Sequence, residues 1–246
     1  MASFALSTAC KRSHAYLPSD GRITARPRDR RTLSKNPSIG EPIKLGLDPS
    51  RDALLFIPKS ATTSSTTNAP LPLLLFLHGA TQSADDMFWY LDAAPEETGV
   101  VILAPNSRNT TWDAISGNFG ADVEFLNRAL DLVFDTAPID PARIAIGGFS
   151  DGATYAIALG LLNGDLFTRV AAFSPGFVMD DAAEGKPRFF ISHGTRDRIL
   201  PIESCGRRVA ADLTSSGYEV SFREFDGGHE IPADVMLDGL RWVSRP

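Results

Sequence analysis

The chain has 246 residues, of which 43% are hydrophobic and 22% are charged, and its formal net charge is −6. These proportions are typical of a globular protein, and no apolar stretch is long enough to predict a membrane-spanning helix. Residues 1–40 contain eight basic and two acidic side chains, so the rest of the chain carries a net charge of −12. An acidic body argues against a nucleic-acid-binding groove, because such grooves are lined by Lys and Arg.

The basic N-terminal segment allows two interpretations. It is rich in arginine, contains serine and is poor in acids, as organelle transit peptides are. Residues 21–40 also fit a basic arm that leads into a first edge strand, because residues 22–26 alternate between polar and apolar. We favour the arm for residues 21–40 and expect residues 1–20 to be a flexible or targeting segment.

The sequence shows neither a secretory signal nor a disulfide framework. The apolar stretch at residues 4–6 is too short for the core of a signal peptide. Two cysteines, Cys10 and Cys205, do not make a disulfide scaffold, and no Cys or His pair has the spacing of a metal site. We therefore expect no metal and a reducing, cytoplasmic location, with organelle targeting as the alternative.

Patterns typical of buried strands alternate with patterns typical of helices along most of the chain. Continuous apolar runs predict central strands that are buried on both faces. Helices are indicated by apolar residues that recur with helical spacing, and Ser83 fits the N-cap of one of them. In chain order, we expect strands at 43–47, 53–57, 73–77, 100–104, 144–148, 169–173, 188–192 and 218–225, helices at 84–98, 122–134, 153–162, 204–216 and 231–243, and polar loops at 58–70 and 106–120.

Strands that alternate with helices of this length predict an α/β protein with a mostly parallel central sheet and helices on both faces. No internal repeat is visible, and no boundary of a second domain is evident after residue 40. Residues 21–246 are therefore expected to form a single domain.

The segment Gly148-Phe149-Ser150-Asp151-Gly152 joins an expected strand to an expected helix. A serine at such a corner is crowded by the residues two before and two after it, and Gly148 and Gly152 remove the side chains that would collide. The serine hydroxyl is then exposed at the carboxyl end of the sheet, at the head of a helix. Ser150 is therefore the predicted nucleophile.

A serine hydroxyl needs a base to take its proton. Functional side chains of such sheets lie at the carboxyl ends of the strands. The hydrolase fold that has a serine at this kind of corner requires the chain order nucleophile, acid, histidine. Only His229 comes late enough, just after the last expected strand, with an acid at a strand end before it. The three other histidines are His14 in the N-terminal arm, His78 after the strand at 73–77, and His193 at the end of the strand at 188–192.

Asp197 is the predicted acid that orients His229 and stabilises its protonated form. It follows the strand at 188–192 and a turn that contains a glycine. The alternatives Asp226 and Glu230 lie too near His229 in sequence to reach its Nδ1 easily. We expect His193 and Arg196 to be structural and to hold the turn of Asp197.

Two backbone N–H groups are expected to form an oxyanion hole. One belongs to Asp151, the residue after the nucleophile, and the other to Gly79 or Ala80 in the loop that begins at His78. An ordinary turn between strand and loop is the alternative interpretation of His78 and Gly79.

The connection between the strands at 169–173 and 188–192 is short. Only 13 residues, 174–186, are available, which is too few for a helical cap, so we expect a shallow, open cleft that takes a small or extended ester. Candidates for its walls, each of which fits ordinary packing equally well, are Trp112, Asp113, Phe149, Phe177 and Val178.

Four motifs in this order resemble the α/β-hydrolase superfamily, and more narrowly its small esterases of the phospholipase/carboxylesterase and polyhydroxybutyrate-depolymerase-like type. The resemblance covers about residues 70–244 and implies ester hydrolysis by a Ser150–Asp197–His229 triad without a cofactor. The chain departs from the family at the oxyanion motif, which has one glycine, and at Asp151, where carboxylesterases of this type often have Gln. The motifs are residues 78–80, 148–152, 193–197 and 227–229.

Other functions use the same residues. A thioesterase or a peptidase would share the triad and the acyl-enzyme chemistry, so the sequence does not separate them from an esterase. A catalytically silent ligand-binding protein of the same fold is a further alternative, although such proteins usually have a replaced triad residue or a cap. The expected partner is a small-molecule ester, and the expected assembly is a monomer or a homodimer.

Overall fold

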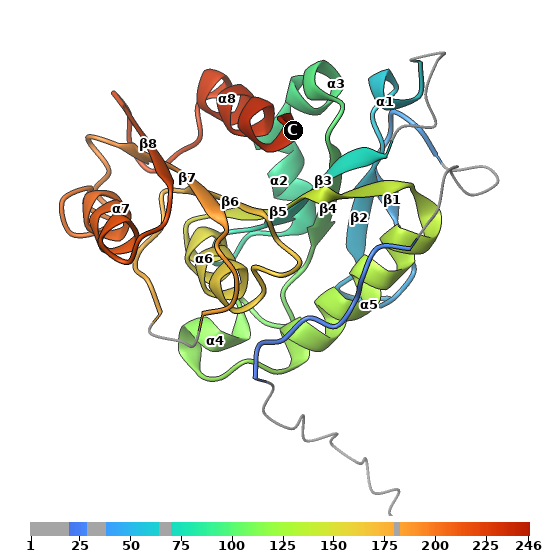
Figure 1. Ribbon diagram of the computed structural model, residues 1–246, viewed down its shortest axis with the longest axis horizontal. Helices are drawn as coiled ribbons and strands as arrows, with labels where there is room; N and C mark the ends of the chain where they lie inside the picture. Colours follow the sequence, from blue (N-terminus) through green and yellow to red (C-terminus); the bar gives the residue numbers. More distant parts are fainter. Residues whose placement is uncertain (1–19, 29–37, 64–69, 180–182) are drawn as a thin grey trace, which may run out of the picture.

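The computed structural model describes residues 20–28, 38–63, 70–179 and 183–246, and these fold around one sheet (Figure 1). The eight strands of this sheet lie in the order β1-β2-β4-β3-β5-β6-β7-β8. The strands are β1 Ile43–Lys44, β2 Ala53–Phe56, β3 Leu71–Leu77, β4 Val101–Pro105, β5 Ile139–Phe149, β6 Arg169–Phe173, β7 Arg188–Gly194 and β8 Val220–Phe225.

Helices cover both faces of the sheet. Side chains of α5, α6 and α7 share one buried cluster with Leu73, Leu75 and Leu77 of β3, whereas α2, α3 and α8 share another with Leu74 and Phe76. The alternation along β3 follows from the pleat, which turns successive side chains to opposite faces. The helices are α1 Ser60–Thr63, α2 Ala84–Leu91, α3 Ala94–Thr98, α4 Asp113–Ser116, α5 Ala121–Thr136, α6 Asp151–Leu162, α7 Gly206–Ser215 and α8 Ala233–Ser244.

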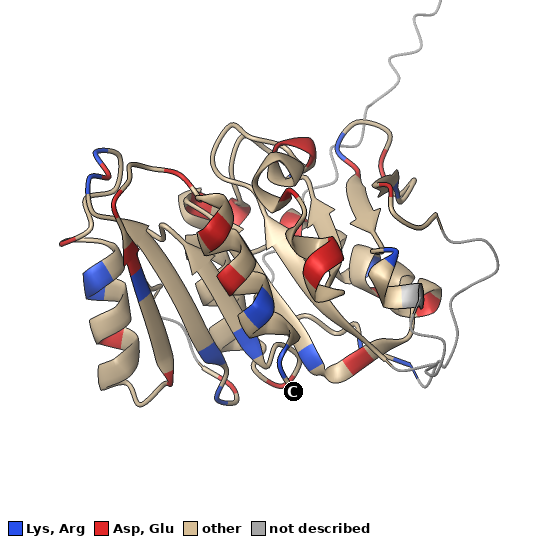
Figure 2. Ribbon diagram, turned by 90° about the horizontal axis from the view of Figure 1, so that it is seen from above, with Lys and Arg blue, Asp and Glu red and all other residues tan. Residues whose placement is uncertain are grey.

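The sheet is mostly parallel, as the sequence predicts. Only the β1–β2 and β2–β4 pairs are antiparallel, and β3 to β8 pair in parallel. The carboxyl ends of β3 to β8 therefore meet at one edge of the sheet. Basic segments gather at the opposite edge, at the lower ends of the central strands in Figure 2, where Arg169 begins β6 and Arg188 begins β7.

One predicted helix is divided in two. The sequence predicts a single helix over residues 84–98, but α2 ends at Leu91 and α3 begins at Ala94. Asp92 between them has a φ of 44° and a ψ of −129°. Pro95, in the first turn of α3, has no N–H to donate to the carbonyl of Leu91, so one continuous helix would leave that acceptor unpaired. The short helices α1 and α4 lie in segments that were expected to be loops.

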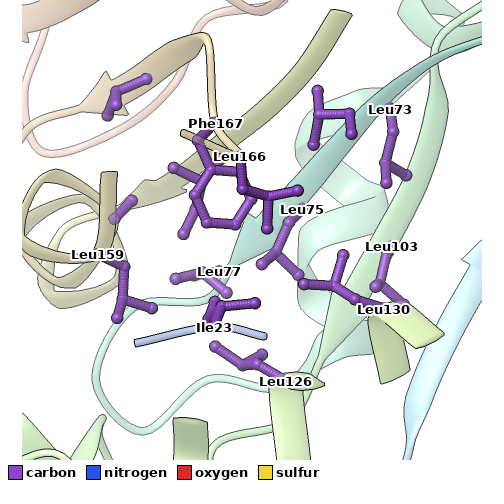
Figure 3. Close-up of a cluster of buried hydrophobic side chains, with 14 of the residues drawn as sticks. Ile23, Leu73, Leu75, Leu77, Leu103, Leu126, Leu130, Leu159, Leu166 and Phe167 are labelled. Atoms are coloured by element: carbon purple, nitrogen blue, oxygen red, sulfur yellow. The ribbon is translucent and has the colours of Figure 1, made fainter. Parts of the chain in front are cut away.

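Residues 22–28 do not form the expected edge strand. The predicted alternation of buried and exposed side chains is present, because Ile23 and Ala25 are buried and Thr24 is exposed. The segment does not join the sheet, however, and lies against α5 and the end of α6. Its backbone amides are bound by two asparagine side chains: Asn163 accepts from Ile23 at 2.7 Å, and Asn127 accepts from Thr24 at 2.7 Å. Ile23 thereby joins the core cluster that contains Leu77, Leu126 and Leu159 (Figure 3).

Candidate active site

Ser150 occupies a sharp corner between β5 and α6. Its φ of 55° and ψ of −120° lie in a region that non-glycine residues rarely adopt. Close packing explains both neighbouring glycines: a Cβ on Gly148 would lie 2.4 Å from the carbonyl carbon of Gly152, and a Cβ on Gly152 would lie 2.3 Å from the carbonyl oxygen of Leu77. The strained corner therefore exists only with these two glycines.

Three side chains from different loops meet at this corner. The Oγ of Ser150 lies 2.9 Å from Nε2 of His229, and Nδ1 of His229 lies 2.6 Å from Oδ2 of Asp197. The side chain of Asp197 is fully buried, whereas that of His229 is 15% exposed. The structure thus joins the predicted nucleophile, base and acid in one chain of hydrogen bonds at the edge of the sheet where the parallel strands end.

Backbone hydrogen bonds between the loops after β7 and β8 bring Asp197 and His229 together. Thr195 donates to the carbonyl of Phe225 at 2.9 Å, and Arg196 donates to that of Gly227 at 2.9 Å. The loops are so close that a Cβ on Gly194 would lie 2.2 Å from the carbonyl oxygen of Gly228. The sequence around each catalytic candidate is therefore rich in glycine because two backbones must approach closely there.

The environment of Asp197 favours its ionised form. Burial alone would raise the pKa of this carboxyl, but the hydrogen bonds from His229 and from the backbone N–H groups of Leu200 and Ile199 outweigh it and hold the pKa below its usual range. Both N–H groups donate to Oδ1 at 2.9 Å, which leaves Oδ2 for the histidine. Asp197 can therefore orient His229 as a carboxylate.

The alternative acids lie elsewhere. Asp226 is exposed and pairs with Arg196 at 3.1 Å, and Glu230 accepts the N–H of Gly228 at 3.0 Å. His193 is fully buried, and its Nε2 lies 2.7 Å from the carbonyl oxygen of Leu200 and 3.3 Å from Oδ2 of Asp197. Burial lowers the pKa of His193, so a neutral ring donates to the turn that carries Asp197.

The candidate oxyanion donors flank Ser150. A Cβ on Gly79 would lie 3.3 Å from the Cβ of Ser150, so this loop passes directly beside Ser150. The N–H of Gly79 already donates to Oε1 of Gln82 at 3.0 Å. In the part of the chain that the structure describes, the N–H groups of Ala80 and Asp151 have no protein acceptor. These two are therefore the donors that remain for a ligand.

His78 and Trp112 support this loop from the core. His78 is fully buried; its Nδ1 lies 2.7 Å from the carbonyl of Gly79, and its Nε2 accepts the N–H of Ser107 at 3.0 Å. Burial lowers the pKa of His78, in agreement with a neutral ring that both donates and accepts. Trp112 donates from Nε1 to the carbonyl oxygen of His78 at 2.8 Å and stacks on Tyr155.

Two predicted cleft residues are placed elsewhere by these contacts. Trp112 is 0% exposed, so its ring cannot form a wall of an open cleft. The carboxylate of Asp113 accepts from the backbone N–H groups of Ala114 and Gly120 and from the hydroxyl of Tyr155, each at 2.8 Å. Asp113 is thus occupied in shaping its own loop, which the polar appearance of residues 106–120 could not reveal.

Asp122, a buried residue in the first turn of α5, carries an unusual carboxyl. Burial, and then the charge of Asp113, raise the pKa of Asp122 from 3.8 to about 6. Between these values the folded protein holds a proton that the unfolded chain releases, so this group makes the protein less stable as pH rises from about 4 to 6.

The Asp122→Asn variant tests this effect. In the wild type, Asp122 should lower the free energy of unfolding by up to about 3 kcal/mol as pH rises from about 4 to 6, and the variant should lack this decrease. Urea denaturation at several pH values measures it, and parallel pH profiles of variant and wild type would contradict the shift.

Phe149 and Phe177 are the aromatic candidates that lie near the site. The ring of Phe149 is buried, with its centroid 4.7 Å from that of His229 and 5.1 Å from that of Tyr90. Phe177 is 51% exposed and follows Gly176, whose N–H donates to Thr154 in the first turn of α6. Within the described residues 174–179 and 183–187, the connection from β6 to β7 contains no helix. No cap is therefore seen over the site in this part of the chain.

Three further residues near the site were not found from the sequence. Gln82 binds the N–H of Gly79 and donates from Nε2 to the hydroxyl of Tyr90 at 3.2 Å. Thr111 donates from Oγ1 to Oδ2 of Asp151 at 2.7 Å. Single polar side chains, such as Gln82 and Thr111 in loops and Tyr90 in α2, carry no periodic signal, so only the three-dimensional contacts identify them.

The described residues include neither a metal-binding cluster nor a membrane-spanning helix. Among them, no group of three or more His, Cys, Asp or Glu side chains is placed to hold a metal ion. None of the helices in that part of the chain has the length and hydropathy that crossing a bilayer requires. Cys205 is buried and free, and Cys10 lies outside the described residues.

The geometry agrees with comparisons to known proteins. Residues 121–244 match the family model described as phospholipase/carboxylesterase. Feruloyl esterase C of Emericella nidulans is 25% identical over an alignment of 168 residues. The match covers 58% of this chain and 61% of that protein, so this chain spans less than two thirds of the length of that relative. A fluorophosphonate-binding serine hydrolase of Staphylococcus aureus superposes with a TM-score of 0.68 at 18% identity, over 85% of this chain and all of the other.

The Bacillus cereus carboxylesterase superposes with a TM-score of 0.59 at 18% identity, over 80% of this chain and 94% of its own. At this level of identity the two structural comparisons show the fold alone, and they confirm the α/β-hydrolase fold that the motifs predict. The match to the family model, which covers half of the chain, shows the family. This chain is a member of the phospholipase/carboxylesterase family of α/β-hydrolases.

Proposed function

We propose that the protein is a serine hydrolase that cleaves carboxylic esters, with Ser150 as nucleophile, His229 as general base and Asp197 as orienting acid. The observation that carries this proposal is the chain of hydrogen bonds from Ser150 to His229 at 2.9 Å and from His229 to Asp197 at 2.6 Å. This chain of hydrogen bonds begins at Ser150, whose backbone conformation is unfavourable in energy. Strained backbone of this kind is commonly found at functional sites.

The reaction has two halves. Nδ1–H of His229 donates to Asp197, which leaves Nε2 free to take the proton of Ser150 as its Oγ attacks the ester carbonyl carbon. The carbonyl oxygen becomes negative and accepts hydrogen bonds from the N–H groups of Ala80 and Asp151. The C–O bond then breaks, and the alcohol leaves with the proton from His229. Water, deprotonated by the same nitrogen, attacks the acyl carbon of the acyl-enzyme. The bond between this carbon and the Oγ of Ser150 breaks, Oγ takes the proton back from His229, and the acid is released.

The surroundings of the site favour a small or extended ester. Phe177, half exposed beside the first turn of α6, and Ile199, 69% exposed on the turn that carries Asp197, offer apolar contacts to a substrate. A cavity of about 280 Å³ lies between Phe177 and α7 and is lined also by Val178 and Arg208. The similarity to a feruloyl esterase supports testing aryl esters of this kind beside simple acyl esters.

The test has two parts. A fluorophosphonate probe is expected to label the folded wild-type protein, with peptide mass spectrometry mapping the adduct to Ser150. A turnover screen over acyl esters of different lengths, feruloyl-type aryl esters, thioesters and peptides is expected to give the highest kcat/KM for an oxygen ester. No labelling and no turnover by folded protein would favour a ligand-binding role, and a higher kcat/KM for thioesters or peptides would replace the proposed substrate class.

A further inference from the structure

A hydrogen bond connects the residue after the nucleophile to the loop that follows β4. The hydroxyl of Thr111 donates to Oδ2 of Asp151 at 2.7 Å, and both residues are partly buried. Among the described residues, none of the ion pairs formed by Lys, Arg or His includes Asp151. The carboxylate beside Ser150 is therefore held by a neutral hydroxyl and by no cationic side chain.

A carboxylate in this place endangers the proposed chemistry. The backbone N–H groups of Asp151 and Ala80 have no protein acceptor in the described structure, and a carboxylate is the strongest acceptor that a side chain offers. Asp151 is also the first residue of α6, where unpaired N–H groups and the helix dipole attract negative charge. If the carboxylate turned toward these donors, it would fill the oxyanion hole or repel the oxyanion.

The loop of Thr111 is fixed to the segment of residues 78–81, which contains Ala80, by hydrogen bonds on both sides of Thr111. The carbonyl of Thr110 accepts the N–H of Thr81 at 2.7 Å, which binds the loop to the segment that contains Ala80. The buried Trp112 donates to the carbonyl of His78 at 2.8 Å. The hydroxyl of Thr111, between these two anchored residues, is therefore set in place before any substrate arrives.

We propose that Thr111 is a positioning residue that holds the Asp151 carboxylate away from the oxyanion donors. The inference rests on the proposed function, since it assigns a role in the oxyanion hole of that same site. It also explains how this chain can have an acid at the position after its nucleophile.

The test uses the full chain and an ester that the wild type turns over. Thr111→Val keeps the shape of the side chain but lacks the hydroxyl, and we expect its kcat to fall by about tenfold to a hundredfold while KM changes little. The rate of labelling by a fluorophosphonate should fall with kcat, because this reaction uses the same donors. Thr111→Ser, which keeps the hydroxyl, should restore most of the activity.

Two controls separate the carboxylate from the packing of the loop. Thr110→Val makes the same change in the neighbouring threonine, whose hydroxyl has no hydrogen-bond partner in the described residues, and should leave kcat unchanged. In an Asp151→Ala background, Thr111→Val should cause no further loss. Thermal denaturation checks that each variant folds, and Thr111→Ala replaces Thr111→Val if the latter does not.

A Thr111→Val variant with wild-type kcat, or with an equal loss in the Asp151→Ala background, would overturn the role of Thr111. These results leave the proposed function intact, because the wild type would still be active. A wild type that turns over no ester and takes no probe would overturn the proposed function instead.

Discussion

Ser150→Ala is expected to abolish turnover of a short p-nitrophenyl ester, and His229→Ala is expected to be about as damaging. Each loss should be about a million-fold in kcat, because members of a triad act as a unit and removing one disables the others. The structure gives the reason: Nε2 of His229 lies 2.9 Å from the Oγ of Ser150, so nucleophile and base are one hydrogen-bonded pair. Steady-state kinetics with purified variants measures the effect.

The control for this pair is a histidine that also touches Asp197 but does not reach the nucleophile. His193 lies 3.3 Å from Oδ2 of Asp197, and its Nε2 is occupied by the carbonyl of Leu200. His193→Gln should therefore cost far less than His229→Ala. Retention of more than about a tenth of wild-type kcat by Ser150→Ala would refute Ser150 as the nucleophile, and a mild effect of His229→Ala would refute His229 as the base.

Gly152→Ala is expected to have the largest effect on stability. The added Cβ would lie 2.3 Å from the carbonyl oxygen of Leu77 and 2.5 Å from that of His78. Both are backbone atoms at the end of the central strand β3, so no rotation of a side chain relieves the contact. The free energy of unfolding should fall by at least about 3 kcal/mol, as expected for severe overpacking. Urea denaturation measures the change.

Gly228→Ala provides the matched comparison, since a Cβ there would meet no atom within 4 Å. The same substitution at this glycine should change the free energy of unfolding by less than about 1 kcal/mol. Equal stability of the Gly152→Ala variant and the wild type would show that the corner at Ser150 can relax, and the argument for strain there would fail.

The sequence predicts the fold well where the signal is local. The apolar run of β3 and the helical spacing in α5 indicate elements of the right type. The motif from Gly148 to Gly152 marks the corner because a Cβ on Gly148 would clash with the backbone of Gly152, a residue near it in sequence. The sequence also predicts Ser150, Asp197 and His229 as a group, because each of them follows the carboxyl end of an expected strand. The structure places these three in hydrogen-bond contact, and their catalytic roles remain a proposal.

Features that depend on contacts between residues far apart in sequence could not be predicted from the sequence. Trp112 looked suited to a cleft wall, but its direction is set by the carbonyl of His78 and the ring of Tyr155, which lie far from it in sequence. The alternation in residues 22–26 gave the correct inward face of the N-terminal arm, yet no pattern showed that asparagine side chains would bind its backbone in place of a strand. Long-range polar partners leave no periodic trace.

The asparagine contacts of the arm have a practical consequence for where a recombinant form of this protein should start. A start at residue 20 would keep the hydrogen bonds from Ile23 to Asn163 and from Thr24 to Asn127, together with the side chain of Ile23 in the core cluster that contains Leu126. A start at residue 38 would take the backbone donors of Ile23 and Thr24 away from the side chains of Asn163, which is buried, and Asn127, which is partly buried. It would also expose apolar side chains between α5 and α6 to water. Such a shortened protein would be prone to aggregate for a reason unrelated to catalysis.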